Sequence, residues 1–251
     1  MGTQPASYPL ALVTGAAQRL GLGFALRLAR LGYAIGLHYN TSAAQAGQAA
    51  AEIRALGVPV FLLQADLRDE AQIRALFAEL DAQLARPQAQ LSGLAVLVNS
   101  AAVMPRGDAR QWSVDEYDAV LSLNLRAPFL CAQQAFQRMT AGGLLINISD
   151  IAAQKAWTAF PAYTISKAGL DSLTRVLARS FAPGVRVNAI APGLALASEN
   201  VSPQEWQRLL NRLPLPRPAA PDELGAALEF LLKNEYITGQ TIVVDGGYSL
   251  L

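Results

Sequence analysis

The sequence has few of the side chains from which several common kinds of site are built. Of its 251 residues, one is cysteine, one is histidine and only 16% are charged, whereas 52% are apolar. With Cys131 as the only cysteine and His38 as the only histidine, the chain cannot form an internal disulfide bond or a zinc cluster. A serine or cysteine nucleophile would have His38 alone as its imidazole partner. We therefore expect no metal site, and chemistry that uses other groups.

The charges are nearly balanced, and no apolar run is long. Twenty lysines and arginines stand against nineteen aspartates and glutamates, so no basic excess would hold nucleic acid or an anionic membrane. No stretch approaches the roughly 20 apolar residues that cross a bilayer, and residues 1–17 lack the basic start and cleavage site of a secretion signal. We expect a cytoplasmic protein whose partner is a small-molecule substrate.

Short apolar runs that alternate with amphipathic helical patterns fill most of the chain. Runs with the length of buried strands occur at 10–14, 34–39, 58–66, 94–99, 144–149, 185–190 and 241–245. Helical patterns lie between them at 19–32, 43–57, 69–85, 112–140 and 161–181. The alternation predicts an α/β fold in which residues 1–251 form a single doubly wound Rossmann-type domain with a seven-stranded parallel sheet.

Residues 191–220 interrupt this alternation with five prolines and read as a long loop with a short helix at 204–213. Loops of this length inside a compact domain usually serve a function. We interpret residues 193–215 as a substrate loop, in which Leu194 and Trp206 contact the substrate.

The turn after the first strand, TGAAQRLG at 14–21, is a candidate phosphate site. In a parallel sheet, ligands bind at the carboxyl ends of the strands, where this turn presents free N–H groups. Gly15, Arg19, Leu20 and Gly21 would line the site, although Arg19 stands where a G-x-G-x-x-G pattern has glycine. Taken alone, the segment fits a pyrophosphate site and a simple turn equally well.

The end of the second strand indicates which cofactor is bound. NAD sites place an acid there to bind the ribose 2′-hydroxyl group. This strand ends instead in neutral and weakly basic residues, namely His38, Tyr39, Asn40, Thr41 and Ser42. With Arg19 close by, they suit a 2′-phosphate, which favours NADPH over NADH. For His38 itself, burial at the strand end is the competing interpretation, and the sequence alone favours it.

Tyr163 and Lys167 lie four residues apart in the segment PAYTISK, on one face of a predicted helix. A nearby ammonium group favours phenolate, so we expect the pKa of Tyr163 to lie below its usual value of about 10. Asp150 ends the strand before this helix, and Asn99 and Asn124 belong to the fourth strand and the helical region after it. The spacing is common by chance, and these neighbours give it weight.

Together these segments resemble the short-chain dehydrogenase/reductase family across nearly the whole chain. TGAAQRLG resembles its cofactor turn, NSAA at 99–102 its N-N-A-G element, and PG at 192–193 and VDGG at 244–247 match in order and position. The resemblance implies that Asn124, Tyr163 and Lys167 are catalytic, and that the chain forms a homotetramer. It further implies that the cofactor contacts Tyr163, Lys167 and the residues after later strands, namely Asp66, Leu67, Asn99, Ser100, Ala101, Pro192 and Gly193.

One departure from the family narrows the resemblance. The active-site serine expected thirteen residues before Tyr163 is Asp150, and the adjacent Ser149 should point to the opposite side of the strand end. Together with Arg19 in the turn, LHYNTSAA at 37–44 and PGLALASENVSPQEW in the loop, Asp150 resembles the pteridine reductases. This implies hydride transfer from NADPH to a carbon of a dihydropterin or dihydrofolate, with Tyr163 supplying a proton and Lys167 holding the nicotinamide ribose.

The resemblance also assigns substrate contacts. Asp150 would accept a hydrogen bond from the pterin amino group or relay a proton, and Arg19 would contact both the cofactor phosphate and the substrate ring. Three positions depart from the pteridine reductases, because Met104 replaces a stacking aromatic residue, Ala102 a serine and Thr41 an arginine that binds the 2′-phosphate. A methionine sulfur still packs on a ring, with a free energy of about 0.3–1.5 kcal/mol.

Two other functions stay open at this point. One is a carbonyl reductase that resembles 3-oxoacyl thioester reductases, which Met104 favours because it suits an aliphatic pocket, and which Asp150 disfavours. The other is a non-catalytic NADP-binding protein, which the intact Asn124, Tyr163 and Lys167 disfavour.

Overall fold

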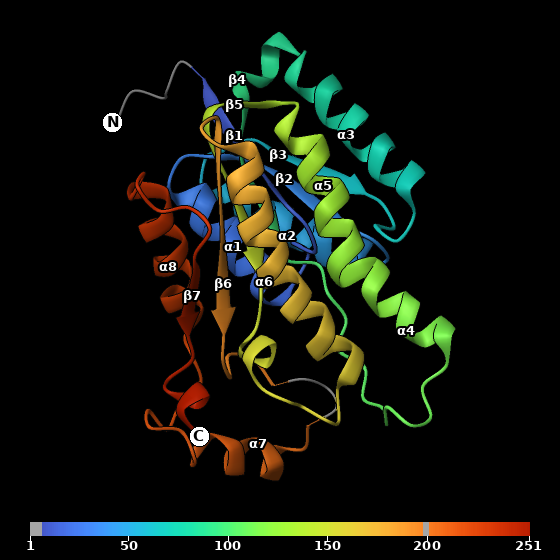
Figure 1. The fold of residues 1–251 in the computed structure, drawn as a ribbon. Helices are drawn as coiled ribbons and strands as arrows, with labels where there is room; N and C mark the ends of the chain where they lie inside the picture. The colour runs from blue at the N-terminus through green and yellow to red at the C-terminus, as the bar shows by residue number, and fades with distance from the viewer. Residues whose placement is uncertain (1–6, 198–200) are drawn as a thin grey trace.

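Seven parallel strands form one sheet in the order β3-β2-β1-β4-β5-β6-β7 (Figure 1). The computed structural model describes residues 7–197 and 201–251. The strands are β1 (Tyr8–Val13), β2 (Ala34–Tyr39), β3 (Val60–Gln64), β4 (Leu91–Asn99), β5 (Met139–Ile148), β6 (Val185–Pro192) and β7 (Thr241–Val244). From β1 the strands are added in one direction to β3, and from β4 they are added in the opposite direction to β7. Sheets of this kind bind ligands at this switch point, between β1 and β4.

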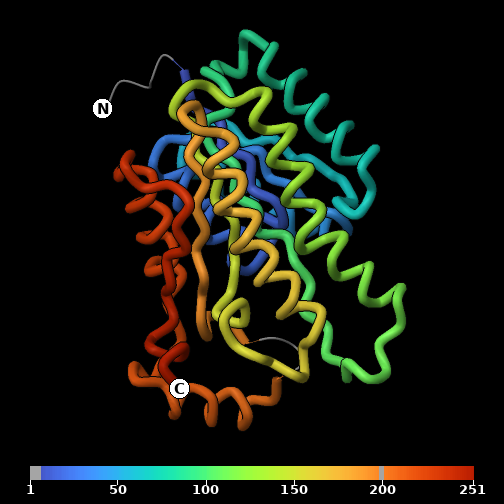
Figure 2. Tube along the Cα trace, viewed as in Figure 1, coloured from blue at the N-terminus to red at the C-terminus, as the bar shows by residue number. Residues whose placement is uncertain are grey.

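Helices cover both faces of the sheet, as the tube view in Figure 2 also shows. They are α1 (Arg19–Arg30), α2 (Ala43–Ala55), α3 (Glu70–Leu84), α4 (Val114–Leu121), α5 (Ala127–Phe136), α6 (Pro161–Phe181), α7 (Pro203–Leu210) and α8 (Pro221–Lys233). On one face α1 packs against α2 and α8, and on the other α5 packs against α3 and α6. Short helical turns at Pro87–Ala89, Ile151–Gln154 and Tyr248–Leu250, and a π-helical turn at Ser122–Arg126, complete the chain.

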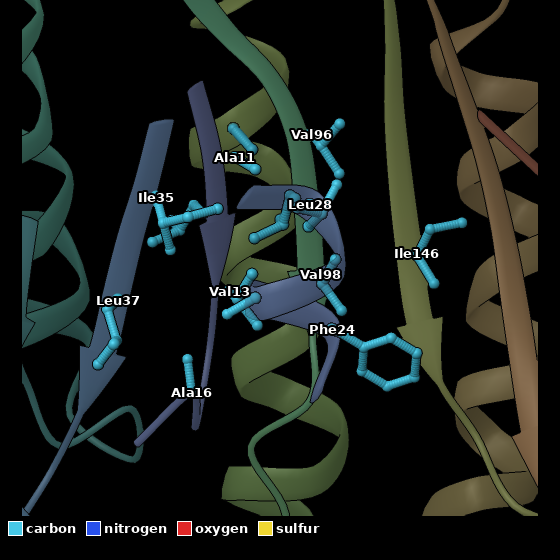
Figure 3. Packing of buried hydrophobic residues seen from close by; sticks show 14 of the residues in the cluster. Ala11, Val13, Ala16, Phe24, Leu28, Ile35, Leu37, Val96, Val98 and Ile146 are labelled. Carbon is cyan, nitrogen blue, oxygen red and sulfur yellow. The ribbon is translucent and has the colours of Figure 1, made fainter. Parts of the chain in front are cut away.

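The core lies between the central strands and the helices on either side. Val13 of β1 pairs in register with Leu37 of β2 and with Val98 of β4. Figure 3 shows Val13 and Val98 close to Leu28 and Phe24 of α1, with Leu37 on the neighbouring strand, and all five side chains are almost completely buried. Strands covered on both faces need apolar residues at successive positions, which is why the central strands are nearly continuous apolar runs. This rigid centre fixes the strand ends that carry the candidate site.

The predicted single α/β domain with seven parallel strands is confirmed, and β2 has the predicted bounds. The helix expected at 112–140 differs, since it begins at Val114, contains the π-helical turn and ends at Phe136. It ends there because β5 starts early, with Met139 paired to Leu94 of β4. Helix α8 was not expected from the sequence. Among the residues that the structure describes, no helix has both the length and the apolar composition to cross a membrane.

Candidate active site

A cavity of about 1190 Å³ opens at the carboxyl ends of the strands. Most residues predicted from the sequence line it, namely Gly15, Arg19, Leu20, Gly21, His38, Asn40, Asp66, Leu67, Ser100, Ala101, Met104, Asp150, Tyr163, Lys167, Pro192, Gly193, Leu194 and Trp206. The structure does not place the other predicted residues in its lining, and these are Tyr39, Thr41, Ser42, Asn99 and Asn124. Within the described ranges, no cluster of three histidine, cysteine or acidic residues has the arrangement of a metal site.

Asp150 and Tyr163 meet in the wall of this cavity. Asp150 lies two residues after the end of β5, and its Oδ1 accepts a hydrogen bond of 2.8 Å from the Ala152 N–H group, which fixes the carboxyl group at the start of the turn Ile151–Gln154. Tyr163 lies in the first turn of α6 and donates a hydrogen bond of 2.8 Å to Oδ2 of Asp150. A tyrosine and a carboxyl group are thus brought into direct contact.

The electrostatics of this pair differ from the expectation. Burial raises the pKa of Tyr163 well above its usual value, and the charge of Asp150 and the hydrogen bond to it raise it further. The prediction of a lowered tyrosine pKa is therefore wrong for the free protein, because the sequence pattern shows the nearby ammonium group but not the burial. Burial also raises the pKa of Asp150, against the hydrogen bonds from Ala152 and Tyr163 and the positive charge of Lys167. Burial thus shifts the pKa values of both groups upward.

Lys167 lies one helical turn beyond Tyr163, as the spacing predicted. Its Nζ donates a hydrogen bond of 2.6 Å to the Ile148 carbonyl oxygen and lies 5.5 Å from the centroid of the Tyr163 ring. The side chain is only 4% exposed. Burial lowers the pKa of Lys167 to about 8, although Asp150 and Asp171 oppose this shift. The ammonium group is thus held beside the phenol at neutral pH.

Asn124 is hydrogen-bonded to the backbone of Val103, a residue that lines the cavity. Its side chain donates to the Val103 carbonyl oxygen and accepts from the Val103 N–H group, both at 2.9 Å, and it also donates to the Ser166 hydroxyl group at 3.2 Å. It sits in the π-helical turn and is buried. These contacts hold the segment after β4 that carries Met104, so Asn124 acts on the site through its neighbours in the free protein.

Asn99 is likewise a structural residue in the free protein. Its amide nitrogen donates to Oδ1 of Asn147 at 3.0 Å and to the Pro128 carbonyl oxygen at 3.4 Å. The next two residues, Ser100 and Ala101, lie in the cavity wall because both of their N–H groups donate to the Thr14 hydroxyl group, at 2.9 and 3.1 Å. The ends of β1 and β4 are held together in this way.

The turn between β1 and α1 fits the pyrophosphate group of a dinucleotide. A Cβ atom on Gly21 would lie 2.2 Å from the Gly15 carbonyl oxygen, and one on Gly15 would lie 2.9 Å from Ala101 Cα. Gly15 has a φ of 64°, and Arg19 a φ of 54°. The N-terminus of α1 has no side-chain cap and no acidic residue in its first turn. Its N–H groups are therefore available to an anion.

His38 ties three strand ends together. Its Nδ1 accepts a hydrogen bond of 3.0 Å from the Gly15 N–H group, so Nε2 carries the proton and donates to the Ala65 carbonyl oxygen at 3.0 Å. The ring is 2% exposed, and burial lowers the pKa of His38 to about 4. Both ring nitrogens are thus engaged within the protein. His38 shapes the cofactor turn, in line with the interpretation that the sequence favoured.

Arg19 reaches toward the substrate loop. Its guanidinium group donates to the carbonyl oxygens of Leu196 and Ala197, at 3.2 and 3.1 Å. The cofactor turn and the start of the loop are thus connected by one side chain. Asp66, which also lines the cavity, forms a bidentate ion pair with Arg68, whose NH2 lies 2.7 Å from Oδ2.

The lining of the cavity has more aromatic residues than expected. Trp206 lies there as predicted, and Trp112, Trp157, Phe160 and Tyr248 join it. The place of Tyr248 in this lining was not expected, although its position directly after VDGG was a signal available in the sequence. An aromatic wall with a carboxyl and a phenol group in it suits a flat ring with polar edges.

Several known proteins are similar to this chain. The family described as enoyl-(acyl carrier protein) reductase matches residues 15–249. The 3-oxoacyl-[acyl-carrier-protein] reductase FabG of Staphylococcus aureus is 34% identical over 244 residues, which cover 94% of this chain and 96% of that protein. The 2-dehydro-3-deoxy-D-gluconate 5-dehydrogenase of Escherichia coli is 34% identical over 250 residues, covering 95% and 94%.

Solved structures share the fold over almost the full length. FolM alternative dihydrofolate reductase 1 from Brucella suis, in complex with NADP, has a TM-score of 0.88 and 32% identity, covering 98% of this chain and 96% of that one. A short chain dehydrogenase from Burkholderia cenocepacia, in complex with NADP, has a TM-score of 0.88 and 28% identity, covering 97% and 98%. The full-length match in sequence and fold shows that this chain belongs to the short-chain dehydrogenase/reductase family of oxidoreductases.

Proposed function

We propose that the protein is an NADPH-dependent reductase of dihydropterins or dihydrofolate. The observation that carries the proposal is the hydrogen bond from the Tyr163 hydroxyl group to Asp150 in the cavity wall. A carboxyl group accepts hydrogen bonds from an amino group, whereas a serine hydroxyl group mainly donates to a carbonyl oxygen. The fold shared with an alternative dihydrofolate reductase supports the same substrate class.

The cofactor side supports a bound NADPH. The glycine turn at 15–21 and the uncapped N-terminus of α1 would hold the pyrophosphate group. The strand ends of β4 and β6 would contact the nicotinamide half through Ser100, Ala101, Pro192 and Gly193, and Leu67 would contact the adenine half. Structural neighbours were crystallised with NADP. When bound, NADPH supplies the hydride.

The protein supplies the proton. Since its pKa is raised, Tyr163 keeps its hydroxyl proton at neutral pH and can donate it to the substrate. Asp150, already hydrogen-bonded to this hydroxyl group, accepts from the amino group of the substrate or returns a proton to Tyr163. Lys167 places a positive charge beside the phenol, which stabilises the phenolate that proton donation leaves behind.

The remaining assignments follow from this proposal. Residues 193–215 act as the substrate loop, in which Leu194 and Trp206 border the substrate together with Met104, since all three line the cavity. Arg19 would exchange its carbonyl partners for cofactor phosphate and substrate ring. The homotetramer and the cytoplasmic location stay predictions.

A second candidate is a 3-oxoacyl thioester reductase. The 34% identity to a 3-oxoacyl-[acyl-carrier-protein] reductase favours it, as does Met104 in the cavity wall. Asp150 disfavours it, because its carboxyl oxygens cannot donate to a substrate carbonyl group once ionised.

A panel of initial-rate assays tests the proposal. NADPH oxidation is measured with dihydrobiopterin, dihydromonapterin, dihydrofolate and an acetoacetyl thioester, and is repeated with NADH. We expect turnover of at least one pterin or folate, with a higher kcat/KM for NADPH than for NADH. Turnover of the thioester alone establishes the second candidate, and no turnover with any pterin or folate contradicts the proposal.

A further inference from the structure

Tyr248 lines the cavity but has no part in the roles assigned above. It begins the helical turn Tyr248–Leu250 that follows β7, and it shares the cavity with Asp150 and Tyr163. Across residues 7–197 and 201–251, its hydroxyl group has no hydrogen-bond partner. A phenol that borders a cavity and lacks a partner has a donor and an acceptor to offer a ligand.

The backbone around Tyr248 is held in one conformation. The Asp245 carboxylate accepts hydrogen bonds from the N–H groups of Gly247 and Ser249, at 2.9 and 2.7 Å. Gly247 has a φ of +84°, and a Cβ atom there would lie 2.7 Å from Pro214. Gly193, in the cavity wall, packs so tightly that a Cβ atom would lie 2.7 Å from Asp245 Cα. The turn is thus fixed against both the end of β6 and the substrate loop.

The ring of Tyr248 is also held in place. Its centroid lies 6.1 Å from that of Trp157, with the two planes at 45°. Nζ of Lys155 lies 5.6 Å from the Tyr248 ring centroid and donates to the Leu251 carbonyl oxygen at 2.5 Å. An ammonium group over a ring face is attractive. Together Tyr248 and Trp157 form a rigid aromatic wall, which needs little ordering when a flat ligand binds.

This wall stands next to Asp150. The turn Ile151–Gln154, which Asp150 caps, packs against the turn Tyr248–Leu250. Burial raises the pKa of Tyr248, the charge of Asp150 raises it further and Arg212 opposes the shift. The hydroxyl group therefore keeps its proton at neutral pH and is able to donate to an acceptor atom of a ligand held at Asp150.

We propose that Tyr248 is a specificity-determining residue, whose ring packs on a flat heteroaromatic substrate and whose hydroxyl group hydrogen-bonds to a polar atom of that ring. The inference rests on the proposed pterin reductase function and deepens it. A linear acyl thioester offers neither a flat ring nor a polar ring edge, so Tyr248 would contribute less to its binding. The aromatic wall takes the place of the stacking residue that Met104 does not provide.

Two variants separate the ring from the hydroxyl group. Tyr248→Phe removes only the hydroxyl group, and Tyr248→Leu removes the aromatic ring. Tyr236→Phe is the matched control, because Tyr236 is fully exposed at 102%. For each protein, KM and kcat are measured with dihydrobiopterin and with an acetoacetyl thioester. The Kd for NADP+ is measured by quenching of tryptophan fluorescence.

We expect Tyr248→Phe to raise KM for dihydrobiopterin about three- to tenfold, the change for one lost neutral hydrogen bond, with kcat changed less than about twofold. Tyr248→Leu should raise this KM further, because the ring contact is also lost. The Kd for NADP+ and the KM for the thioester should stay at the values of wild type and Tyr236→Phe.

Three results overturn the inference. If wild type reduces dihydrobiopterin and both variants keep its KM, or if both weaken NADP+ binding equally, Tyr248 does not select the substrate and the pterin reductase function stands. If wild type reduces no pterin or folate, the proposed function fails and the inference fails with it. The wild-type assay therefore separates the two failures.

Discussion

The hydroxyl group of Tyr163 donates a hydrogen bond to Oδ2 of Asp150, over 2.8 Å. With a serine at position 150, Tyr163 would have only the positive charge of Lys167 beside it, which lowers a tyrosine pKa. Asp150 has the opposite effect, since its charge and its hydrogen bond both raise the pKa of Tyr163. Burial is the largest cause of the raised pKa of Tyr163, and Asp150 adds to it. The phenol therefore stays protonated, the form that a reductase needs in order to deliver a proton to its substrate.

The cofactor turn requires glycine at position 21. A Cβ atom there would lie 2.2 Å from the Gly15 carbonyl oxygen, so Gly21→Ala must displace the turn. We expect the free energy of unfolding to fall by about 2 kcal/mol and the Kd for NADP+, measured by calorimetry, to rise at least about tenfold. Gly47→Ala is the control, because a Cβ atom at this position in α2 meets nothing within 4 Å. It should raise stability by about 0.5–1 kcal/mol and leave NADP+ binding unchanged. Equal behaviour of the two variants would contradict this role of Gly21.

The arginine that the pteridine reductases have at position 41 can be restored. Thr41 is exposed in the short connection between β2 and α2. Thr41→Arg should lower KM for NADPH about three- to tenfold through a charge-assisted contact with the 2′-phosphate. KM for NADH should not change, and the gain should shrink with added salt. An equal change for both cofactors would show that residue 41 does not face the 2′-phosphate.

His38 makes stability depend on pH in the acidic range. Its pKa is about 4 in the folded protein against 6.5 for a free imidazole, so the unfolded chain binds more protons between these values. The stabilisation is complete above pH 6.5 and is lost as the pH falls to 4, by about 3 kcal/mol.

Urea unfolding of wild type and His38→Gln at several pH values measures this loss. Glutamine keeps a donor and an acceptor but does not titrate. Since the chain has one histidine, the difference between the two proteins isolates this group. The variant should lose less stability on acidification, and parallel curves would contradict the account.

The buried ammonium group of Lys167 should lower the free energy of unfolding, although the reaction needs it. Its pKa is about 8 when folded against 10.5 when free, so below pH 8 the fold bears the full cost of a buried ammonium group. We expect Lys167→Met to lose turnover yet to raise the free energy of unfolding at pH 7 by about 2 kcal/mol, net of the lost hydrogen bond to Ile148. The gain should shrink as the pH rises from 8 to 10.5. A lower free energy of unfolding for Lys167→Met than for wild type at pH 7 would show that burial of the ammonium group does not destabilise the fold.

The sequence predicted the order of elements well where the apolar pattern is strong. The run at 34–39 became β2 with the same bounds, and PAYTISK opens α6. The early start of β5 at Met139 was not predictable, because this segment with two glycines joins the sheet through pairs with distant strands, Met139 with Leu94 of β4 and Gly143 with Val185 of β6.

The candidate site was predictable in its members and less so in their roles. The four-residue spacing predicted that Tyr163 and Lys167 lie side by side, and the position of Asp150 in the sequence predicted that it lies near them. The sequence did not show that the side chains of Asn99, Asn124 and His38 are used in hydrogen bonds within the protein, because their partners lie far away along the chain. The burial that reverses the pKa shift of Tyr163 is also a property of the fold.

The most direct test of the central claim compares two substrates across a change at Asp150. The measurement is kcat/KM for dihydrobiopterin and for an acetoacetyl thioester, with wild type, Asp150→Ser and Asp150→Asn, the last of which keeps the shape of the side chain without its charge. We expect wild type to prefer the pterin, and Asp150→Ser to lose about a hundredfold in kcat/KM with it while gaining with the thioester. Pterin reduction that survives unchanged in both variants would contradict the role assigned to Asp150.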